Sequence, residues 1–518
     1  MNSIYNKLLE YYHLSDEEFK FLSKPLSEVV LKDPTTINGM KEAVDRIKRS
    51  IKAKEKIIIY GDYDCDGISA TSIMVKTFSK LNYPVAYYIP SRYMDGYGIN
   101  VENISKIAKA GYKLIITVDN GISANEAIDK AKELGIDVIV VDHHEVPVEK
   151  VNAFIIIHPI VSKISPIVGS GGYMSLFLSA GLLGYHDDYL VTLAGLSTIS
   201  DLMELKDYNR DVVRLALNNL ENNHYPSLMM LLDNPSLITE KSFALEIAPK
   251  INSIGRMQED TSINRLVKYL TSESSEEIIN IKEWIISTNE ERKNLTKEAI
   301  ITLPVLDNLS GICLLTDMKE GLIGLIANRV MNDKKVPVIV FTSDDKDPTI
   351  LKGSIRSKEG FNVVKAFKSL DKYLLTGGGH ALAGGLSIKK ADFENFKTDF
   401  ENLCRQYPIE EENEQTIKIS LTDITLDNYK ILRSFAPFGM GFKEPTFEID
   451  SLPTRSLSFI SQGKHLSTPL SIKSKILGFN LNEGEIKANK TINIFGNFNL
   501  SEYRNVQTLE FRITKYTK

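Results

Sequence analysis

Acidic residues follow three hydrophobic segments of the chain, in the sequences IIIYGDYDCDG (57–67), LIITVDNG (114–121) and VIVVDHH (138–144). The carboxyl ends of parallel strands meet at one edge of an open α/β sheet, where such folds bind ligands. We therefore expect the following residues to lie together: Asp62, Asp64, Asp66, Asp119, Asp142, His143 and His144. Crowded carboxylates raise each other's pKa, and divalent cations relieve the repulsion. Carboxylate and imidazole ligands suit manganese, magnesium or zinc, so the pattern predicts a pair of divalent cations.

Each of these acidic segments has a simpler interpretation. If the backbone is extended, Asp62, Asp64 and Asp66 point to one side and could share a site. The simpler interpretation of the same spacing is a calcium-binding loop. No downstream Glu completes an EF-hand, and a hydrophobic strand precedes the motif, which favours a sheet-edge site. Asp119 before Asn-Gly is also typical of a turn. Asp201 in LSTISDLMEL is equally typical of a helix cap.

Strands and helices alternate from about residue 40 to 205, which indicates a mainly parallel sheet with helices on both faces. A helical region follows from about 206 to 303 and ends in a long amphipathic stretch, interpreted as a connecting helix. A second, smaller α/β unit is expected from about 304 to 405. The acidic segment 410–415 is a predicted linker. Short strands after it are consistent with a small antiparallel barrel such as an OB-fold.

This pattern predicts four domains. They comprise residues 1–215, 216–303, 304–408 and 409–518. A chain of 518 residues is too long for one hydrophobic core, which agrees with several domains.

Composition is that of a globular protein, with 43% hydrophobic and 25% charged residues. No apolar run approaches the roughly 20 residues that span a membrane, and the N-terminus lacks the pattern of a signal peptide. Three widely spaced cysteines make a disulfide framework implausible. We therefore expect a cytoplasmic protein without membrane contact.

Charge is distributed unevenly along the chain. The whole chain has a net charge of −5, whereas residues 451–518 contain ten Lys or Arg and four Glu, an excess of six positive charges. A basic module attached to an acidic body fits a polyanionic substrate. The alternative is that these basic residues simply lie on a solvent-exposed surface and bind no partner.

Several motifs occur in an order that resembles the DHH phosphoesterase superfamily and, within it, the RecJ family of single-strand-specific exonucleases. The motifs of the DHH domain and its extension are resembled by DYDCDG, SRYMDGYGIN, TVDNGIS, VDHHEVP, STISDLMEL and INSIGRM. Those of the DHH-associated domain are resembled by EGLIGLIANRV, GSIRS and GGGHALAGGLSI. FAPFGMGFKEPTF resembles the segment that leads into the family's OB-fold. The resemblance covers nearly the whole chain.

The resemblance implies two divalent cations, Mn²⁺ or Mg²⁺, in the DHH domain. The implied ligands are Asp62 and Asp64 for one ion, Asp66, His143 and Asp201 for the other, and Asp119 between the two. Asp142 and His144 are the candidate catalytic residues, which either orient a ligand or touch the scissile phosphate.

Basic residues and glycines in the matched motifs predict phosphate and nucleic-acid contacts. A guanidinium binds a terminal 5′-phosphate through two hydrogen bonds, and a glycine-rich backbone forms a nest for an anion. The candidates are Arg92, Arg256, Ser354, Arg356, Gly377, Gly378, Gly379 and His380.

The expected function is a RecJ-like exonuclease that degrades single-stranded DNA from the 5′ end to mononucleotides, in recombination and repair. A helicase or a single-strand-binding protein is an expected partner, and a monomer the default state. We expect no further partner-binding domain after the barrel. Two departures from the family pattern, SGGYMSLFL and the neighbours of Asp201, affect substrate details rather than the ligands.

Two rival functions remain at this stage. One is a DHH phosphodiesterase acting on short oligonucleotides or cyclic dinucleotides, which would not need the barrel. The other is a non-catalytic DNA-binding scaffold, which would have lost metal ligands that this chain retains.

Overall fold

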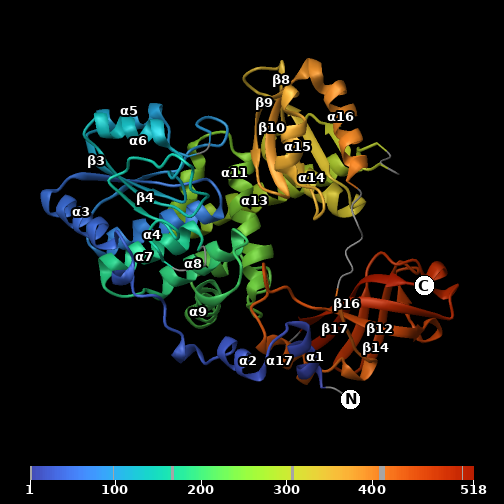
Figure 1. Ribbon diagram of the computed structural model, residues 1–518. Helices are drawn as coiled ribbons and strands as arrows, with labels where there is room; N and C mark the ends of the chain where they lie inside the picture. Colours follow the sequence, from blue (N-terminus) through green and yellow to red (C-terminus); the bar gives the residue numbers. More distant parts are fainter. Residues whose placement is uncertain (1–2, 97, 165–168, 305–308, 408–414, 504–505) are drawn as a thin grey trace. The chain divides into compact units, whose positions relative to one another are not determined.

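The computed structural model describes residues 3–96, 98–164, 169–304, 309–407, 415–503 and 506–518 (Figure 1). The chain forms two compact units. The large unit comprises Lys32–Asp201 and Ala216–Glu411, and the small unit comprises Met1–Leu31, Leu202–Leu215 and Glu412–Lys518.

The first sheet of the large unit has five parallel strands in the order β2-β1-β3-β4-β5. Its strands are β1 (Lys56–Tyr60), β2 (Ala86–Tyr88), β3 (Tyr112–Val118), β4 (Asp137–Val141) and β5 (Ile155–Ile157). Tyr60 pairs with Thr117, and Val118 pairs with Val141, so β1, β3 and β4 end at one level. The expected convergence of the three strand ends is confirmed.

Helices cover both faces of this sheet, as the alternating pattern predicts (Figure 1). Helices α5 (Val101–Lys109) and α6 (Asn125–Glu133) pack on one face, and α3 (Met40–Ala53), α4 (Cys65–Lys80) and α7 (Gly171–Leu183) on the other. Helix α8 (Asp188–Ser200) packs against both α4 and α7. Because both faces are covered, the central strands are apolar and buried almost throughout.

The predicted helical region forms a series of helices. They are α9 (Asp207–Asn223), α10 (Pro226–Met229), a π-helical turn (Ser242–Ile247), α11 (Ala248–Met257), α12 (Asn264–Thr271) and α13 (Ser275–Ile301). Helix α13 is the long helix that the amphipathic stretch predicts, and it contacts α11, α12 and α14 (Glu320–Lys334).

The second sheet of the large unit is mixed, in the order β6-β7-β8-β10-β9. Its elements are β6 (Ile312–Leu315), β7 (Val338–Ser343), β8 (Ile350–Arg356), α15 (Val363–Ser369), β9 (Leu374–Gly379), β10 (Ala383–Lys389) and α16 (Phe393–Gln406). Helix α14 contributes to the apolar core on one face, which contains Ile326 and Val340. Residues of α15 and α16 contribute to the core on the other face, which contains Phe341 and Phe396.

The small unit contains a seven-stranded sheet in the order β11-β12-β16-β17-β15-β14-β13. Its strands are β11 (Thr416–Lys418), β12 (Thr446–Pro453), β13 (Phe459–Ile460), β14 (His465–Ser471), β15 (Ser474–Gly478), β16 (Thr491–Tyr503) and β17 (Val506–Thr517). Its helices are α1 (Ile4–Tyr11), α2 (Asp16–Leu22), α17 (Leu426–Ser434) and α18 (Glu483–Lys487). The sheet is not purely antiparallel as expected, because β11 pairs with β12, and β15 with β17, in parallel.

The N-terminal residues belong to the small unit, although the sequence groups them with the first domain. Ile4 and Leu8 of α1 lie in one apolar core with Ile417 and Phe447 of the sheet. The predicted linker at 410–415 lies outside the described residues except for Gln415. The predicted boundaries near 215, 303 and 408 stay predictions. Among the described helices, none is long and apolar enough to cross a membrane.

Candidate metal centre

The loop after β1 carries the first three carboxylates of the site. Asp64 has an extended backbone and caps α4, since its Oδ1 accepts the N–H groups of Asp66 and Gly67 at 2.9 and 3.1 Å. A Cβ at Gly67 would lie 2.5 Å from the carbonyl oxygen of Asp62, so only glycine permits this close approach. The expected extended arrangement is wrong for Asp66, which stands in the first turn of α4.

Asp119 follows β3 with a φ of 60°, a left-handed conformation that few non-glycine residues adopt. Its N–H donates to the carbonyl of Val141, which fixes the turn against β4. The carboxylate is buried, and Oδ1 lies 3.1 Å from Nε2 of His143. Strained backbone at a buried acid is typical of functional sites.

Asp142 orients the two histidines that follow β4. Its Oδ1 accepts the N–H of His143 at 2.7 Å and bonds Nδ1 of His144 at 2.7 Å, and its Oδ2 accepts the N–H of Ile122 at 2.9 Å. Both oxygens of Asp142 are thus engaged by protein groups. Nε2 of His144 is the ring nitrogen turned away from Asp142.

Asp201 reaches the site from the C-terminal end of α8, where it is the cap residue. Its Oδ2 lies 3.5 Å from Nε2 of His143. Burial and the negative charges of Asp66 and Asp64 raise the pKa of Asp201 to about 8. Asp201 thus ends α8 through its backbone rather than capping a helix start with its side chain, and its role as a ligand stays a prediction.

Three groups of side chains have atoms close enough to hold a cation, within 4.8 Å of one another. They are Asp62, Asp64 and Asp119; Asp66, His143 and Asp201; and Asp119, His143 and His144. The first two groups coincide with the division between two ions that the family resemblance implies, whereas the third places His144 beside Asp119 and His143. The assignment of each residue as a ligand stays a prediction.

The electrostatics of these groups fit divalent cations. Burial, followed by the repulsion of neighbouring carboxylates, raises the pKa values of Asp62 and Asp119 well above the ordinary range. Oδ1 of Asp62 is buried, and nothing in the described part of the chain donates a hydrogen bond to it. A positive ion would supply the missing partner and relieve the repulsion, so the donor set fits a metal.

An arginine-rich cavity of about 270 Å³ lies in the same unit. Arg92, Arg256, Ser354 and Arg356 all line it, so the structure brings together these four predicted residues from α11, β8 and the segment after β2. Burial and the charges of Arg92 and Arg356 lower the pKa of Arg256 to about 10. A bound anion would relieve this repulsion, as expected for a phosphate site.

The other predicted phosphate contacts do not join this cavity. Gly377 and Gly378 form β9, where they pair with Leu386 and Gly385 in an antiparallel ladder. The predicted nest is therefore not formed, because these glycines adopt an extended strand at the sheet edge. Gly379 closes the strand, and the N–H of His380 donates to the carbonyl of Ala383 at 2.8 Å. Their contact with nucleic acid stays a prediction.

Sequence reasoning missed residues that support the acidic loop. Oδ1 of Asn252 accepts the N–H of Cys65 at 2.7 Å, and the Arg92 guanidinium stacks on the Tyr63 ring at 4.4 Å. Asn252 belongs to the matched motif INSIGRM, which is the one signal that pointed to it. The stack on Tyr63 left no signal in the sequence.

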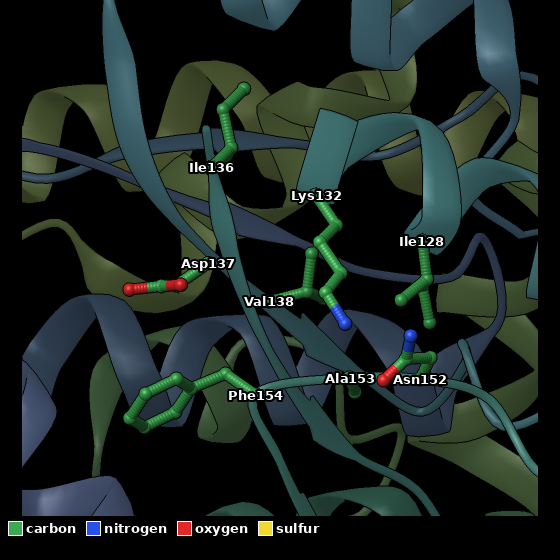
Figure 2. A pocket seen from close by; sticks show the side chains of 8 residues that line it. All are labelled: Ile128, Lys132, Ile136, Asp137, Val138, Asn152, Ala153 and Phe154. Carbon is green, nitrogen blue, oxygen red and sulfur yellow. The ribbon is translucent and has the colours of Figure 1, made fainter. Parts of the chain in front are cut away.

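A smaller cavity of about 190 Å³ lies at the other end of the first sheet (Figure 2). It is lined by Lys132 at the end of α6, Asp137 at the start of β4 and Phe154 before β5. The acidic cluster follows the opposite end of β4, so this cavity is separate from the candidate metal centre.

Three family models match the chain. The DHH family, N-terminal domain, matches residues 56–212, the DHHA1 domain matches 310–406, and the RecJ OB domain matches 416–515. The chain thus contains regions that match the DHH, DHHA1 and RecJ OB domains, in that order. The sequence resemblance is thereby confirmed.

Two RecJ proteins illustrate the relationship. The chain is 32% identical over 498 residues to the single-stranded-DNA-specific exonuclease RecJ of Bacillus subtilis (strain 168), covering 91% of this chain and 62% of that protein. The chain thus spans less than two thirds of the Bacillus protein. The chain is 27% identical over 457 residues to RecJ of Haemophilus influenzae, and this match covers 80% of this chain and 78% of that protein.

The fold matches a crystal structure of RecJ in complex with Mn²⁺ from Thermus thermophilus, with a TM-score of 0.84. The match covers 99% of this chain and 76% of the Thermus chain at 23% identity. The expected architecture of a parallel-sheet DHH domain, a long helix, a smaller α/β domain and an OB domain is thereby confirmed.

Proposed function

We propose that this chain is a single-strand-specific 5′→3′ DNA exonuclease acting in recombination and repair. It would hydrolyse phosphodiester bonds with two divalent cations, Mn²⁺ or Mg²⁺, and release 5′-mononucleotides. The observation that carries the proposal is that two candidate ligand groups meet where Oδ1 of Asp119 lies 3.1 Å from Nε2 of His143. The names of the Bacillus and Haemophilus relatives, and the Mn²⁺ in the Thermus structure, support it.

Residues of three strand ends and two helices would hold the ions. One ion would bind Asp62, Asp64 and Asp119, and the other Asp66, His143 and Asp201, with Asp119 near both. When bound, a pair of divalent cations polarises the phosphodiester and activates water at neutral pH. The left-handed turn at Asp119 would hold its carboxylate close to both groups, since Oδ1 lies 3.1 Å from Nε2 of His143.

His144 is the candidate that touches the scissile phosphate. Burial disfavours its charged form, but the hydrogen bond and charge of Asp142 outweigh burial and raise the pKa of His144 to about 9. At neutral pH the imidazole is therefore a cation that donates from Nε2. Such a donor stabilises the negative charge that develops on the phosphate in the transition state. Asp142 acts through His144, as a positioning residue.

The arginine cavity is the proposed site for the 5′-terminal phosphate. Arg92, Arg256 and Arg356 supply guanidinium donors, and the hydroxyl of Ser354 lies 3.0 Å from Nη1 of Arg356. The described residues offer no hydrogen-bond partner for the buried Nε of Arg92. A phosphate monoester satisfies such donors and neutralises the repelling charges, which favours a 5′-phosphorylated end.

The OB domain would hold the remainder of the single strand. The basic excess of residues 451–518 and the exposed ring of Phe479 suit phosphates and stacked bases. Phe498 is buried and belongs to the core, whereas Phe459, Phe495 and Tyr516 are partly exposed. The side chain of Tyr503 lies outside the described residues. A helicase or single-strand-binding partner, a monomeric state and a cytoplasmic location stay predictions.

Digestion of a 3′-labelled single-stranded oligonucleotide tests the proposal. The substrate would carry or lack a 5′-phosphate, and a blunt duplex of the same sequence would be the control. With Mn²⁺ or Mg²⁺ we expect progressive shortening of the single strand from its 5′ end, faster with the phosphate and absent for the duplex. Asp119→Ala should abolish it.

Other outcomes would favour the rivals. An intact long strand with hydrolysis of dinucleotides would favour a phosphodiesterase of short substrates. Tight binding of single strands without hydrolysis would favour a scaffold.

A further inference from the structure

The carboxylate of Asp66 is anchored by groups from two other helices. The N–H of Gly171 donates to Oδ2 at 2.8 Å, and the N–H of Gly172 donates to Oδ1 at 2.7 Å. The hydroxyl of Ser197 donates to the same Oδ1 at 2.5 Å. Oδ1 thus has two donors, whereas Oδ2 has one and lies 3.6 Å from Nε2 of His143. Oδ2 is therefore the oxygen that faces the candidate metal centre.

Ser197 connects Asp66 to a second residue of the same ligand group. It stands on α8 one turn before Asp201, and its carbonyl accepts the N–H of Asp201 at 3.0 Å. Its side chain contacts Asp66 and its backbone contacts Asp201, which with His143 form one of the candidate cation groups. Displacement of Ser197 would disturb two of the three members.

The hydroxyl of Ser197 has a single orientation in this network. Its oxygen lies 3.1 Å from the N–H of Gly172 and 2.6 Å from Oγ of Ser170. Oγ of Ser170 accepts the N–H of Tyr173 as the cap of α7, which leaves its own proton for Ser197. The proton of Ser197 then points to Asp66. All these groups are buried, so no water competes for the bond.

The glycine pair allows α7 to approach the site. A Cβ at Gly172 would lie 2.4 Å from Oγ of Ser197, and a Cβ at Gly171 would lie 2.5 Å from the side chain of Asp119. The two segments that depart from the family pattern, SGGYMSLFL and STISDLMEL, therefore meet at Asp66. Each supplies donors to the same carboxylate.

We propose that Ser197 is a positioning residue of the metal centre. Its hydroxyl holds Oδ1 of Asp66 so that Oδ2 remains directed at the cation site. This inference rests on the proposed function, and adds to it a residue that touches neither metal nor substrate. Loss of such a supporting hydrogen bond costs metal affinity about 10- to 100-fold.

Calorimetric titration of the metal-free protein with Mn²⁺ tests the role of Ser197. In Ser197→Ala we expect one of two ions to bind about 10- to 100-fold more weakly and the other as in the wild type. The rate of hydrolysis by Ser197→Ala should recover as the Mn²⁺ concentration is raised. A purely structural defect would not recover in this way. The matched control is Ser72→Ala, since Ser72 is equally buried but donates to the carbonyl of Ile68 rather than to Asp66.

Two further variants separate the possible failures. Ser197→Cys keeps a weaker donor on a slightly larger side chain, so it should give intermediate affinity even if Ser197→Ala folds poorly. Unchanged Mn²⁺ binding in both Ser197 variants, with one ion lost in Asp66→Ala, would overturn the role of Ser197 alone. Retention of both ions in Asp66→Ala would overturn the metal assignment on which the proposed function depends.

Discussion

The guanidinium of Arg92 lies over the aromatic ring of Tyr63, 4.4 Å from the ring centroid. Tyr63 stands between Asp62 and Asp64 in the acidic loop, and Arg92 lines the arginine cavity. The stack therefore links the proposed phosphate site to the candidate metal centre through two adjacent side chains. A shift of the loop would also shift the arginine.

Replacement of the Tyr63 ring should weaken substrate binding more than catalysis. Tyr63→Ala removes a half-buried cation–π contact of about 1 to 2 kcal/mol, so KM for a 5′-phosphorylated strand should rise about 5- to 30-fold. Steady-state kinetics on a single-stranded oligonucleotide would measure it. Tyr63→Phe keeps the ring and should stay near the wild type. An unchanged KM in Tyr63→Ala would contradict the role of the stack.

Neutralisation of the arginine cavity should remove the preference for a 5′-phosphate. In Arg256→Gln we expect kcat/KM for the 5′-phosphorylated strand to fall about 10- to 100-fold, towards the value for a 5′-hydroxyl strand. Parallel assays with both strands would measure the ratio. Arg405→Gln is the control, because Arg405 is exposed on α16 and bonds Asn402. A ratio that persists in Arg256→Gln would exclude this cavity as the terminal-phosphate site.

Asp119→Asn should stabilise the metal-free protein while abolishing its activity. The substitution removes one buried carboxylate whose pKa is raised by burial and by its acidic neighbours. Without metal, Tm should rise by about 2–4 °C for each kcal/mol of repulsion removed. Hydrolysis should fall more than about 100-fold, and the rise in Tm on adding Mn²⁺ should shrink. Thermal unfolding with EDTA and with Mn²⁺ checks both parts, and a lower metal-free Tm would contradict the argument.

Glu510 should stabilise the small unit in a pH-dependent way. Burial favours its neutral form, but hydrogen bonds from Lys475 and Arg512, at 3.0 and 2.9 Å, outweigh burial and lower the pKa of Glu510. The contribution of Glu510 to the free energy of unfolding is therefore fully present at a pH above its ordinary pKa of 4.5. It is lost as the pH falls through the lower pKa of the folded state.

Glu510→Gln tests this contribution. At pH 7 the variant should lose about 1.5–3 kcal/mol of unfolding free energy, and the difference should close in acid. Glu483→Gln removes a surface pair with Lys487 and should change stability by less than about 0.5 kcal/mol. Chemical unfolding at several pH values measures both. A loss in Glu510→Gln that is constant with pH would show that its charge is not responsible.

The sequence was sufficient to predict the strand ends and their acids. Asp62, Asp119 and His143 each follow a short apolar segment, and parallel pairing brings the ends of these segments to one level. The long helix α13 was also predictable, from its amphipathic pattern. These features depend on local patterns and on one general rule of sheet geometry.

Other features depend on contacts between distant residues that no local pattern encodes. Ser197 meets Asp66 across 131 positions, and α1 packs into a core with residues more than 400 positions away. The nest predicted at Gly377–Gly379 was wrong because β9 pairs with β10, and strand pairing competes with a turn for the same backbone groups. An extended backbone was expected at Asp66, but Asp64 caps α4 and Asp66 therefore lies in the first turn of that helix.

Anomalous diffraction from crystals grown with Mn²⁺ tests the central claim most directly, because it locates each ion independently of activity. We expect two peaks about 3.5–4 Å apart, with a carboxylate oxygen of Asp119 near both. One peak should lie beside Asp62 and Asp64, and the other beside Asp66, His143 and Asp201. A single peak, or two peaks away from Asp119, would contradict the account.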